Sequence, residues 1–252
     1  MELFSRGIMD GVKSAFPNTQ WTAVVSAACS DNTERRQQAL SGLCQDYWRP
    51  LYAFSRRLGH DVHDAQDLTQ GFFAYLLQHG VLHTASRELG TLRTFLLKIF
   101  QRYIRDVKDR DSALKRGGGM HFISLNAGEL GEACDVDMAA LETPELSYDR
   151  AWAHEVLRGA LQQLGNTEKA AGRGRLFEVL ESCLNPETIN ETNYGNAAAQ
   201  LGMTQEAVRQ IVSRLRKKFR ECLRSKIAAT LHEPDDERID EELRALRAVL
   251  RG

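Results

Sequence analysis

The residues of this sequence with the most distinctive chemistry are lysines and arginines, which are concentrated in one short stretch. Eight lysines and arginines occur between Arg209 and Lys226 with a single acid, Glu221, although the chain as a whole has a net charge of only −1. Guanidinium and ammonium groups at this density are suited to binding phosphates. The stretch therefore predicts contact with nucleic acid, although charge alone also fits an amphipathic helix with a solvated basic face.

The residue spacing around the start of this stretch is typical of a helix-turn-helix. Gly202 provides a turn residue that tolerates positive φ, and Ala198 is small enough to let a second helix pack closely. Thr204 is placed to cap that second helix. Val208 and Ile211 then fall on its inner face. These positions favour a helix-turn-helix over a merely solvated basic helix.

Polar side chains remain exposed near the start of the predicted second helix, where they would face base edges in a major groove. The predicted DNA contacts are Thr204, Gln205, Glu206, Arg209, Gln210, Ser213, Arg214 and Lys217. Further cations follow, and we expect these to meet phosphates or a partner protein: Arg216, Lys217, Lys218 and Arg220.

Other kinds of chemistry have little support in the sequence. The five cysteines are an odd number and lie far apart, so neither a disulfide framework nor a zinc site is indicated. There is no P-loop, H-E-x-x-H or G-x-S-x-G motif, so we predict no cofactor, no metal and no enzymatic activity. No apolar run approaches the roughly 18 residues that span a bilayer, and the N-terminus lacks the apolar stretch of a secretory signal. We therefore predict a cytoplasmic protein without membrane insertion.

The elements that must position these residues are predicted to be helical throughout, which gives an all-α fold. Apolar residues recur every three or four positions, and no sustained alternation indicates a strand. We expect Pro50 to kink or break a helix and Gly165 to end one. The predicted helices span about 18–29, 33–58, 61–78, 91–111, 147–165, 176–184, 196–201 and 205–223.

Charge alternates in blocks along the chain and suggests separate tasks for separate segments. Residues 93–116 and 194–226 are basic, whereas residues 127–148 and 233–242 are acidic. We predict two small helical domains joined by a flexible acidic linker. The predicted segments are an N-terminal extension (1–15), a first domain (16–112), the linker (113–146), a second domain (147–228) and an acidic tail (229–252).

Four apolar residues of the tail keep helical spacing, namely Ile239, Leu243, Leu246 and Leu250. We expect an amphipathic helix that packs on the second domain or covers its basic surface. A loose, solvated tail is the alternative.

Three stretches of the chain, in a fixed order, carry motifs typical of one known protein family. Residues 47–77 read YWRPLYAFSRRLGHDVHDAQDLTQGFFAYLL and are similar to sigma region 2.1 to 2.2, with its D-A-E-D-L-x-Q-x-x-F pattern. Residues 90–110, GTLRTFLLKIFQRYIRDVKDR, resemble region 2.3 to 2.4. Residues 194–221, YGNAAAQLGMTQEAVRQIVSRLRKKFRE, resemble region 4.2. Together the three stretches resemble bacterial RNA polymerase sigma factors of the extracytoplasmic-function (ECF) group. The resemblance implies a sigma factor that binds core RNA polymerase and directs it to promoters, with sigma region 2 and sigma region 4 as its two domains.

The resemblance also implies a partner for each stretch. Core polymerase would bind through its β′ clamp helices and its β flap, the clamp helices contacting Asp64, Asp67 and Gln70. The −10 element of promoter DNA would meet Lys98, Arg102 and Arg105, and the loop at 78–89 would take a flipped base. The −35 element would meet the second helix of the helix-turn-helix, with base contacts from Arg209, Gln210, Ser213 and Arg214.

The sequence departs from the family pattern at Gln66, where the pattern has its second acid. Thr69 lies three residues on, and a phosphate there would replace the missing charge. Thr69 is thus a candidate phosphosite for a Ser/Thr kinase, and an anti-sigma factor is another expected regulator by resemblance.

Two other functional classes stay open at this point. A helix-turn-helix regulator that binds operator DNA without polymerase would need neither the second basic helix nor the acidic face. It would also bind duplex DNA tightly on its own. An enzyme is the other class, and no catalytic motif supports it.

Overall fold

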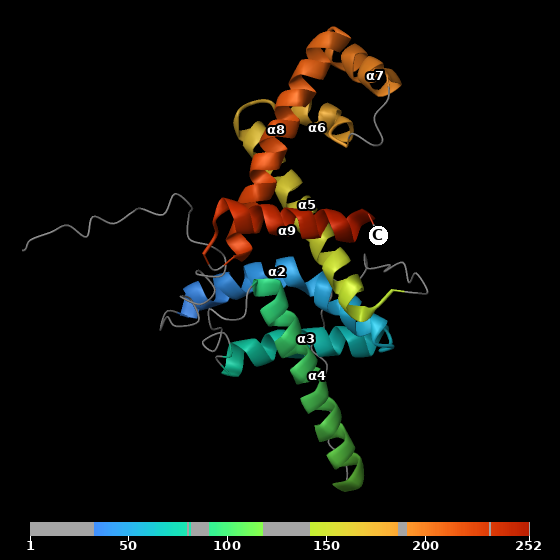
Figure 1. Cartoon of the computed structure of the whole chain (residues 1–252), viewed down its shortest axis with the longest axis vertical. Coiled ribbons are helices and arrows are strands. Elements are labelled where there is room, and N and C mark those ends of the chain that lie inside the picture. Colours follow the sequence, from blue (N-terminus) through green and yellow to red (C-terminus); the bar gives the residue numbers. More distant parts are fainter. Residues whose placement is uncertain are drawn as a thin grey trace, which may run out of the picture.

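The computed structural model describes residues 33–79, 81, 91–117, 142–185, 191–231 and 233–251, and these residues form an all-α fold. In these ranges the only β pairing is an isolated bridge between Thr91 and Leu231. The all-α prediction is confirmed for the described residues. The elements (Figure 1) are α2 (Thr33–Arg57), α3 (Val62–His79), α4 (Leu92–Gly117), α5 (Pro144–Ala170), α6 (Gly174–Leu180), the 3₁₀ turn η3 (Glu181–Cys183), α7 (Glu191–Leu201), α8 (Gln205–Thr230) and α9 (Asp236–Arg251).

Several predicted features lie outside the described residues. They are the helix near 18–29, most of the loop at 78–89 and the central part of the linker, residues 118–141. Helices α4 and α5 extend into the predicted linker from its two sides, as far as Gly117 and from Pro144.

Two helices continue through residues that the sequence predicts as interruptions. Helix α2 runs unbroken through Pro50, whose neighbours Tyr47 and Leu51 are fully buried, so packing offsets the backbone hydrogen bond that proline removes. Helix α5 continues past Gly165 to Ala170. A Cβ atom on Gly165 would lie 2.9 Å from Cε1 of Phe177, so this glycine makes room for α6 and does not end the helix.

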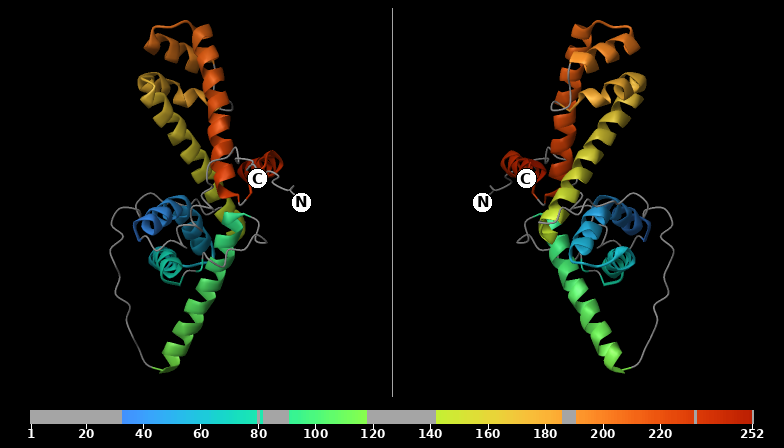
Figure 2. Two further views of the ribbon diagram at one scale, coloured as in Figure 1. Left: turned by 90° about the vertical axis from the view of Figure 1, so that its left-hand side faces the viewer. Right: turned by 90° about the vertical axis from the view of Figure 1, so that its right-hand side faces the viewer.

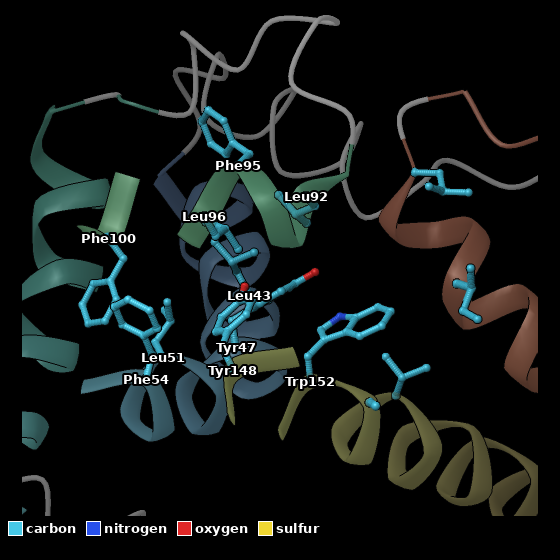
Figure 3. Close-up of a cluster of buried hydrophobic side chains, with 14 of the residues drawn as sticks. Leu43, Tyr47, Leu51, Phe54, Leu92, Phe95, Leu96, Phe100, Tyr148 and Trp152 are labelled. Carbon is cyan, nitrogen blue, oxygen red and sulfur yellow. The ribbon is translucent and has the colours of Figure 1, made fainter. Parts of the chain in front are cut away.

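A first buried cluster joins α2, α3 and α4 to the N-terminal half of α5. Figure 3 shows side chains from α2, α4 and α5 that meet in this cluster, among them Tyr47, Phe100 and Trp152. An ion pair between Arg49 and the buried Glu155 (3.2 Å) also crosses from α2 to α5. The same cluster includes residues near the end of α8 and in α9: Ile227, Ala228, Ile239 and Leu246. Residues of both predicted domains thus share one core, and the division into two domains stays a prediction.

A second buried cluster is formed by the C-terminal half of α5 together with α6, η3, α7 and the first half of α8. Its fully or nearly fully buried members include Leu164, Leu180, Val208 and Val212. Helices α5 and α8 pack against each other and contribute to both clusters. In Figures 1 and 2, α7 lies at one end of the molecule and the C-terminal half of α4 projects at the other.

The C-terminal segment forms helix α9, which packs against α5 and α8. Ile239 and Leu246 are buried, and Leu243 and Leu250 are partly buried against the first cluster. The predicted amphipathic tail helix is therefore confirmed, and the loose tail is not observed. None of the helices in the described ranges has the length and apolar character that crossing a bilayer requires.

Candidate nucleic-acid interface

The turn between α7 and α8 has the predicted geometry. Gly202 adopts a φ of +63°, a backbone conformation in which a residue with a side chain would be strained. The Met203 N–H donates to the Ala198 carbonyl at 3.0 Å and closes the end of α7. The Thr204 hydroxyl oxygen then accepts from the Ala207 N–H at 3.2 Å and caps the start of α8. The sequence therefore specifies both the end of one helix and the start of the next.

The packing of α7 against α8 uses small residues on one side and branched residues on the other. Ala197 and Ala198 are buried on α7, and Val208 and Val212 are fully buried on α8. Ile211 is only partly buried against the same cluster. The alanines allow α8 to cross α7 closely. The side of α8 that faces away from this contact is exposed to solvent.

The exposed side of α8 carries nearly all of the predicted DNA contacts. Seven of these residues are exposed: Thr204, Gln205, Glu206, Gln210, Ser213, Arg214 and Lys217. Arg209 is half-exposed, with its Cζ 5.4 Å from the ring centroid of Tyr194 and its Nη1 3.7 Å from Oε2 of Glu206. Tyr194 therefore orients Arg209, a role that the sequence analysis did not assign.

Some cations of α8 bind other parts of the protein. Arg216 donates to the carbonyls of Cys183 (3.0 Å) and Leu184 (3.2 Å), which caps the end of η3. Lys218 Nζ lies 2.5 Å from Oε1 of Glu168. Arg216 and Lys218, which were expected to meet phosphates or a partner protein, thus also form contacts that support the second cluster.

The remaining cations in this part of α8 point outward. Lys217 and Arg220 are exposed, and neither forms an ion pair within the part of the chain that the structure describes. They lie one or two turns beyond the base-contacting positions. This placement suits phosphate contacts beside a groove.

Glu168 is a buried carboxylate that the sequence analysis missed. Only 1% of its side chain is exposed, and it accepts from Arg173 (2.6 Å) as well as from Lys218. The hydrogen bond from Arg173 lowers the pKa of Glu168 from its usual 4.5, burial opposes the shift, and Lys218 reinforces it. The carboxylate therefore stays charged and links α5 to α8 through its ion pair with Lys218.

Helix α4 presents a second basic face. Lys98, Arg102 and Arg105 are all exposed, and their spacing of four and three residues places them on one side of the helix. Phe95 is buried and Tyr103 is half-buried against Phe72, so both residues pack in the core. The C-terminal half of α4 projects from the rest of the molecule, and no other helix lies beside it in Figure 1.

The start of α3 presents an acidic surface. Asp64 and Asp67 are exposed and Gln70 is half-exposed. Neither aspartate forms a side-chain ion pair within the described ranges. Asp61 caps the helix by accepting from the Asp64 N–H (2.8 Å), and this bond lowers the pKa of Asp61. The carboxylates of Asp64 and Asp67 are thus presented to solvent on the first two turns of a capped helix.

Thr69 does not lie on this surface, which corrects the expectation of an accessible phosphosite. Its side chain is fully buried, and its hydroxyl donates to the Ala65 carbonyl at 2.7 Å. Ala65, Thr69, Phe72 and Leu76 form the buried stripe, whereas Leu68 is only half-buried. A kinase would have to displace α3 from the core to reach this hydroxyl.

Comparison with known proteins adds no relative to this description. A search of protein-family models gives no match, and searches of curated proteins and of solved structures give none either.

The three surfaces lie on three different elements. The exposed side of α8 beside α7 and the basic face of α4 lie toward opposite ends of the molecule (Figure 2). The acidic surface lies on α3, which packs against α4. Within the described ranges, no group of three or more His, Cys, Asp or Glu is placed to hold a metal ion.

Proposed function

We propose that the chain is a sigma factor of the ECF group, which binds core RNA polymerase and directs it to promoters. The observation that carries this proposal is the α7–α8 unit, with Gly202 at φ +63°, the Thr204 cap and an exposed row of polar residues at the start of α8. A helix presented in this way fits a major groove.

The α8 face contacts the −35 element. Arg209 and Arg214 suit the O6 and N7 atoms of guanine, and Gln210 suits the N6 and N7 atoms of adenine. Tyr194 holds Arg209 in position through its ring face. Lys217 and Arg220 fix the register of the helix through phosphates.

The α4 face contacts the −10 element. Lys98, Arg102 and Arg105 are exposed along one side of a helix whose other side is anchored by Phe95 and Phe100 in the core. Cations held this way bind phosphates, and each contact increases the salt dependence of binding.

The α3 face contacts polymerase. Asp64 and Asp67 offer charge, and Gln70 a hydrogen-bonding amide, to a basic surface on the β′ clamp helices. The second half of the chain binds the β flap. These assignments follow from the resemblance together with the exposure of the three side chains, and they imply action in the cytoplasm, where transcription takes place.

The proposal is tested by in vitro transcription with bacterial core polymerase on a library of genomic fragments, with the 5′ ends of the transcripts mapped. We expect start sites that share two sequence elements upstream. Initiation that does not depend on the added protein would refute the proposal. The matched control is the double variant Asp64→Asn and Asp67→Asn, which should lose initiation while retaining its fold.

A helix-turn-helix regulator that acts without polymerase is the second candidate. It is favoured by the first buried cluster, which joins residues of both predicted domains into one body. Such a regulator binds a specific duplex tightly on its own. A sigma factor needs polymerase to arrange its two promoter-contacting faces, so specific binding by the isolated protein separates the two candidates.

A further inference from the structure

Arg93, at the start of α4, connects three helices. Its Nη1 lies 2.5 Å from Oδ1 of Asp149 on α5, and its Nε lies 3.1 Å from Oε2 of Glu242 on α9. Its Cζ stands 4.8 Å from the ring centroid of Trp152. The backbone carbonyl of Arg93 also accepts from the Tyr148 hydroxyl at 2.9 Å. Arg93 is therefore an internal partner, unlike the other cations of the α4 face.

Helix α9 contacts α8 as well as α4. Arg224 of α8 forms ion pairs with Asp236, at 2.5 Å, and with Asp240. Ahead of α9, Leu231 pairs with Thr91 just before α4. The C-terminal segment therefore bridges the start of α4 and the end of α8.

The apolar side of α9 is part of the core that it covers. Ile239 is 1% exposed and Leu246 is 3% exposed, and both belong to the cluster that contains Tyr47 and Trp152. Buried branched residues of this kind stabilise a structure far more than exposed ion pairs do. The apolar contacts therefore carry most of the stability of the α9 contact, and Glu242 fixes its position.

We propose that α9 is an intramolecular strap that stabilises the joint between α2–α4 and α5–α8. When α9 is docked, the basic face of α4 and the exposed face of α8 belong to one body. When α9 is displaced, the joint opens more often, so the first cluster, which spans the joint, loosens while the second cluster keeps its structure. The proposal concerns only the joint, so its test does not depend on which DNA or polymerase the two faces bind.

Amide hydrogen–deuterium exchange on the full-length chain tests the strap, because it reports local opening segment by segment. The main variant is Ile239→Ala combined with Leu246→Ala, which removes the apolar anchor. Glu242→Gln is the milder variant, since it removes the charge that faces Arg93 and keeps the shape. Glu241→Gln is the matched control, because Glu241 is the neighbouring carboxylate and is exposed.

We expect the double variant to exchange at least about tenfold faster at 92–100 of α4 and at 147–156 of α5, as well as in α9. Exchange in α6, in α7 and at 205–215 of α8 should change less than about twofold. Glu242→Gln should show the same pattern at smaller amplitude, about threefold, and carries the test if the double variant does not fold. Glu241→Gln should match the wild type.

Two results would overturn the strap. Faster exchange confined to α9 would mean that this helix does not stabilise the joint. Equal acceleration in both clusters would mean that α9 supports the whole fold and not the joint.

Discussion

Helices α4 and α8 are both basic and both 26 residues long, yet they use their cations differently. Three cations of α8 bind carbonyl or carboxylate groups of other elements. Arg216 donates to the carbonyls of Cys183 and Leu184, Lys218 pairs with the carboxylate of Glu168, and Arg224 pairs with carboxylates of α9. In the described part of α4, Arg93 is the cation that makes such contacts. The exposed cations of α4 instead follow one open side of the helix.

The difference shows that the density of positive charge does not by itself identify a nucleic-acid surface. A cation beside a buried carboxylate or a helix-end carbonyl supports the fold, and removing it costs stability. Removing a cation that has no such partner weakens binding instead. Substitutions at the two kinds of residue therefore separate a loss of stability from a loss of binding.

The largest effect is expected at the buried carboxylate of α5. Glu168→Gln should lower the free energy of unfolding by about 1–3 kcal/mol at pH 7, because Arg173 and Lys218 lose a charged acceptor. Denaturant titration followed by circular dichroism measures this difference. An unchanged midpoint would show that the α8 cations near Glu168 are not structural.

The same substitution has a defined pH dependence. The pKa of Glu168 is lowered in the folded state, so its stabilising effect is fully present above about pH 4.5 and is lost as pH falls through the folded-state pKa. The difference between wild type and Glu168→Gln should therefore shrink on acidification from pH 7 toward pH 3. A constant difference across that range would contradict the assignment.

A comparable effect, but on binding, is expected at the exposed face of α8. Arg214→Ala should weaken promoter-specific binding by about 1–3 kcal/mol if its guanidinium contacts a guanine, and should leave stability within about 0.5 kcal/mol. Arg216→Ala is the matched comparison, since it should lower stability through its lost bonds to the η3 carbonyls. If the two variants behave alike in both measurements, the distinction drawn within α8 is wrong.

A smaller effect on stability is expected at the turn. Gly202→Ala should cost about 1–2 kcal/mol, because φ is +63° and an alanine there is strained. A Cβ atom at this position meets nothing within 4 Å, so the cost comes from the backbone alone. Gly195→Ala in α7 is a useful comparison, since its Cβ would touch only a side-chain amide.

The smallest single effects are expected along α4. Lys98→Ala, Arg102→Ala and Arg105→Ala should each leave the melting temperature unchanged and reduce the salt dependence of DNA binding by about 0.9 in the log–log slope. Binding of the polymerase complex is measured at several salt concentrations. Unchanged slopes in all three variants would remove α4 from the interface.

Local signals allowed the sequence to predict some features well. The Gly202 turn and the Thr204 cap depend on residues within one helical turn of each other, and both are present. The helix in the tail follows from apolar spacing alone. Each of these features depends on contacts that are near in sequence or on a simple periodicity.

Other features depend on which elements meet in space, and the sequence does not contain that information locally. Gly165 resembles a helix end, but the approach of Phe177 explains it. Thr69 has the side chain of a surface residue, yet it is fully buried, whereas the apolar Leu68 beside it is only half-buried. Glu168 binds Lys218, fifty residues away, so no local pattern separates it from an ordinary exposed glutamate.

The central claim is tested most directly by a double-mutant cycle between Arg214 and the upstream promoter element. Initiation with core polymerase is measured for the wild type and Arg214→Ala, on a mapped promoter and on variants with each upstream base pair changed in turn. We expect a coupling of about 1–3 kcal/mol at one base pair and none at the others. Equal loss of initiation at every promoter variant, or no initiation above polymerase alone, would contradict the account.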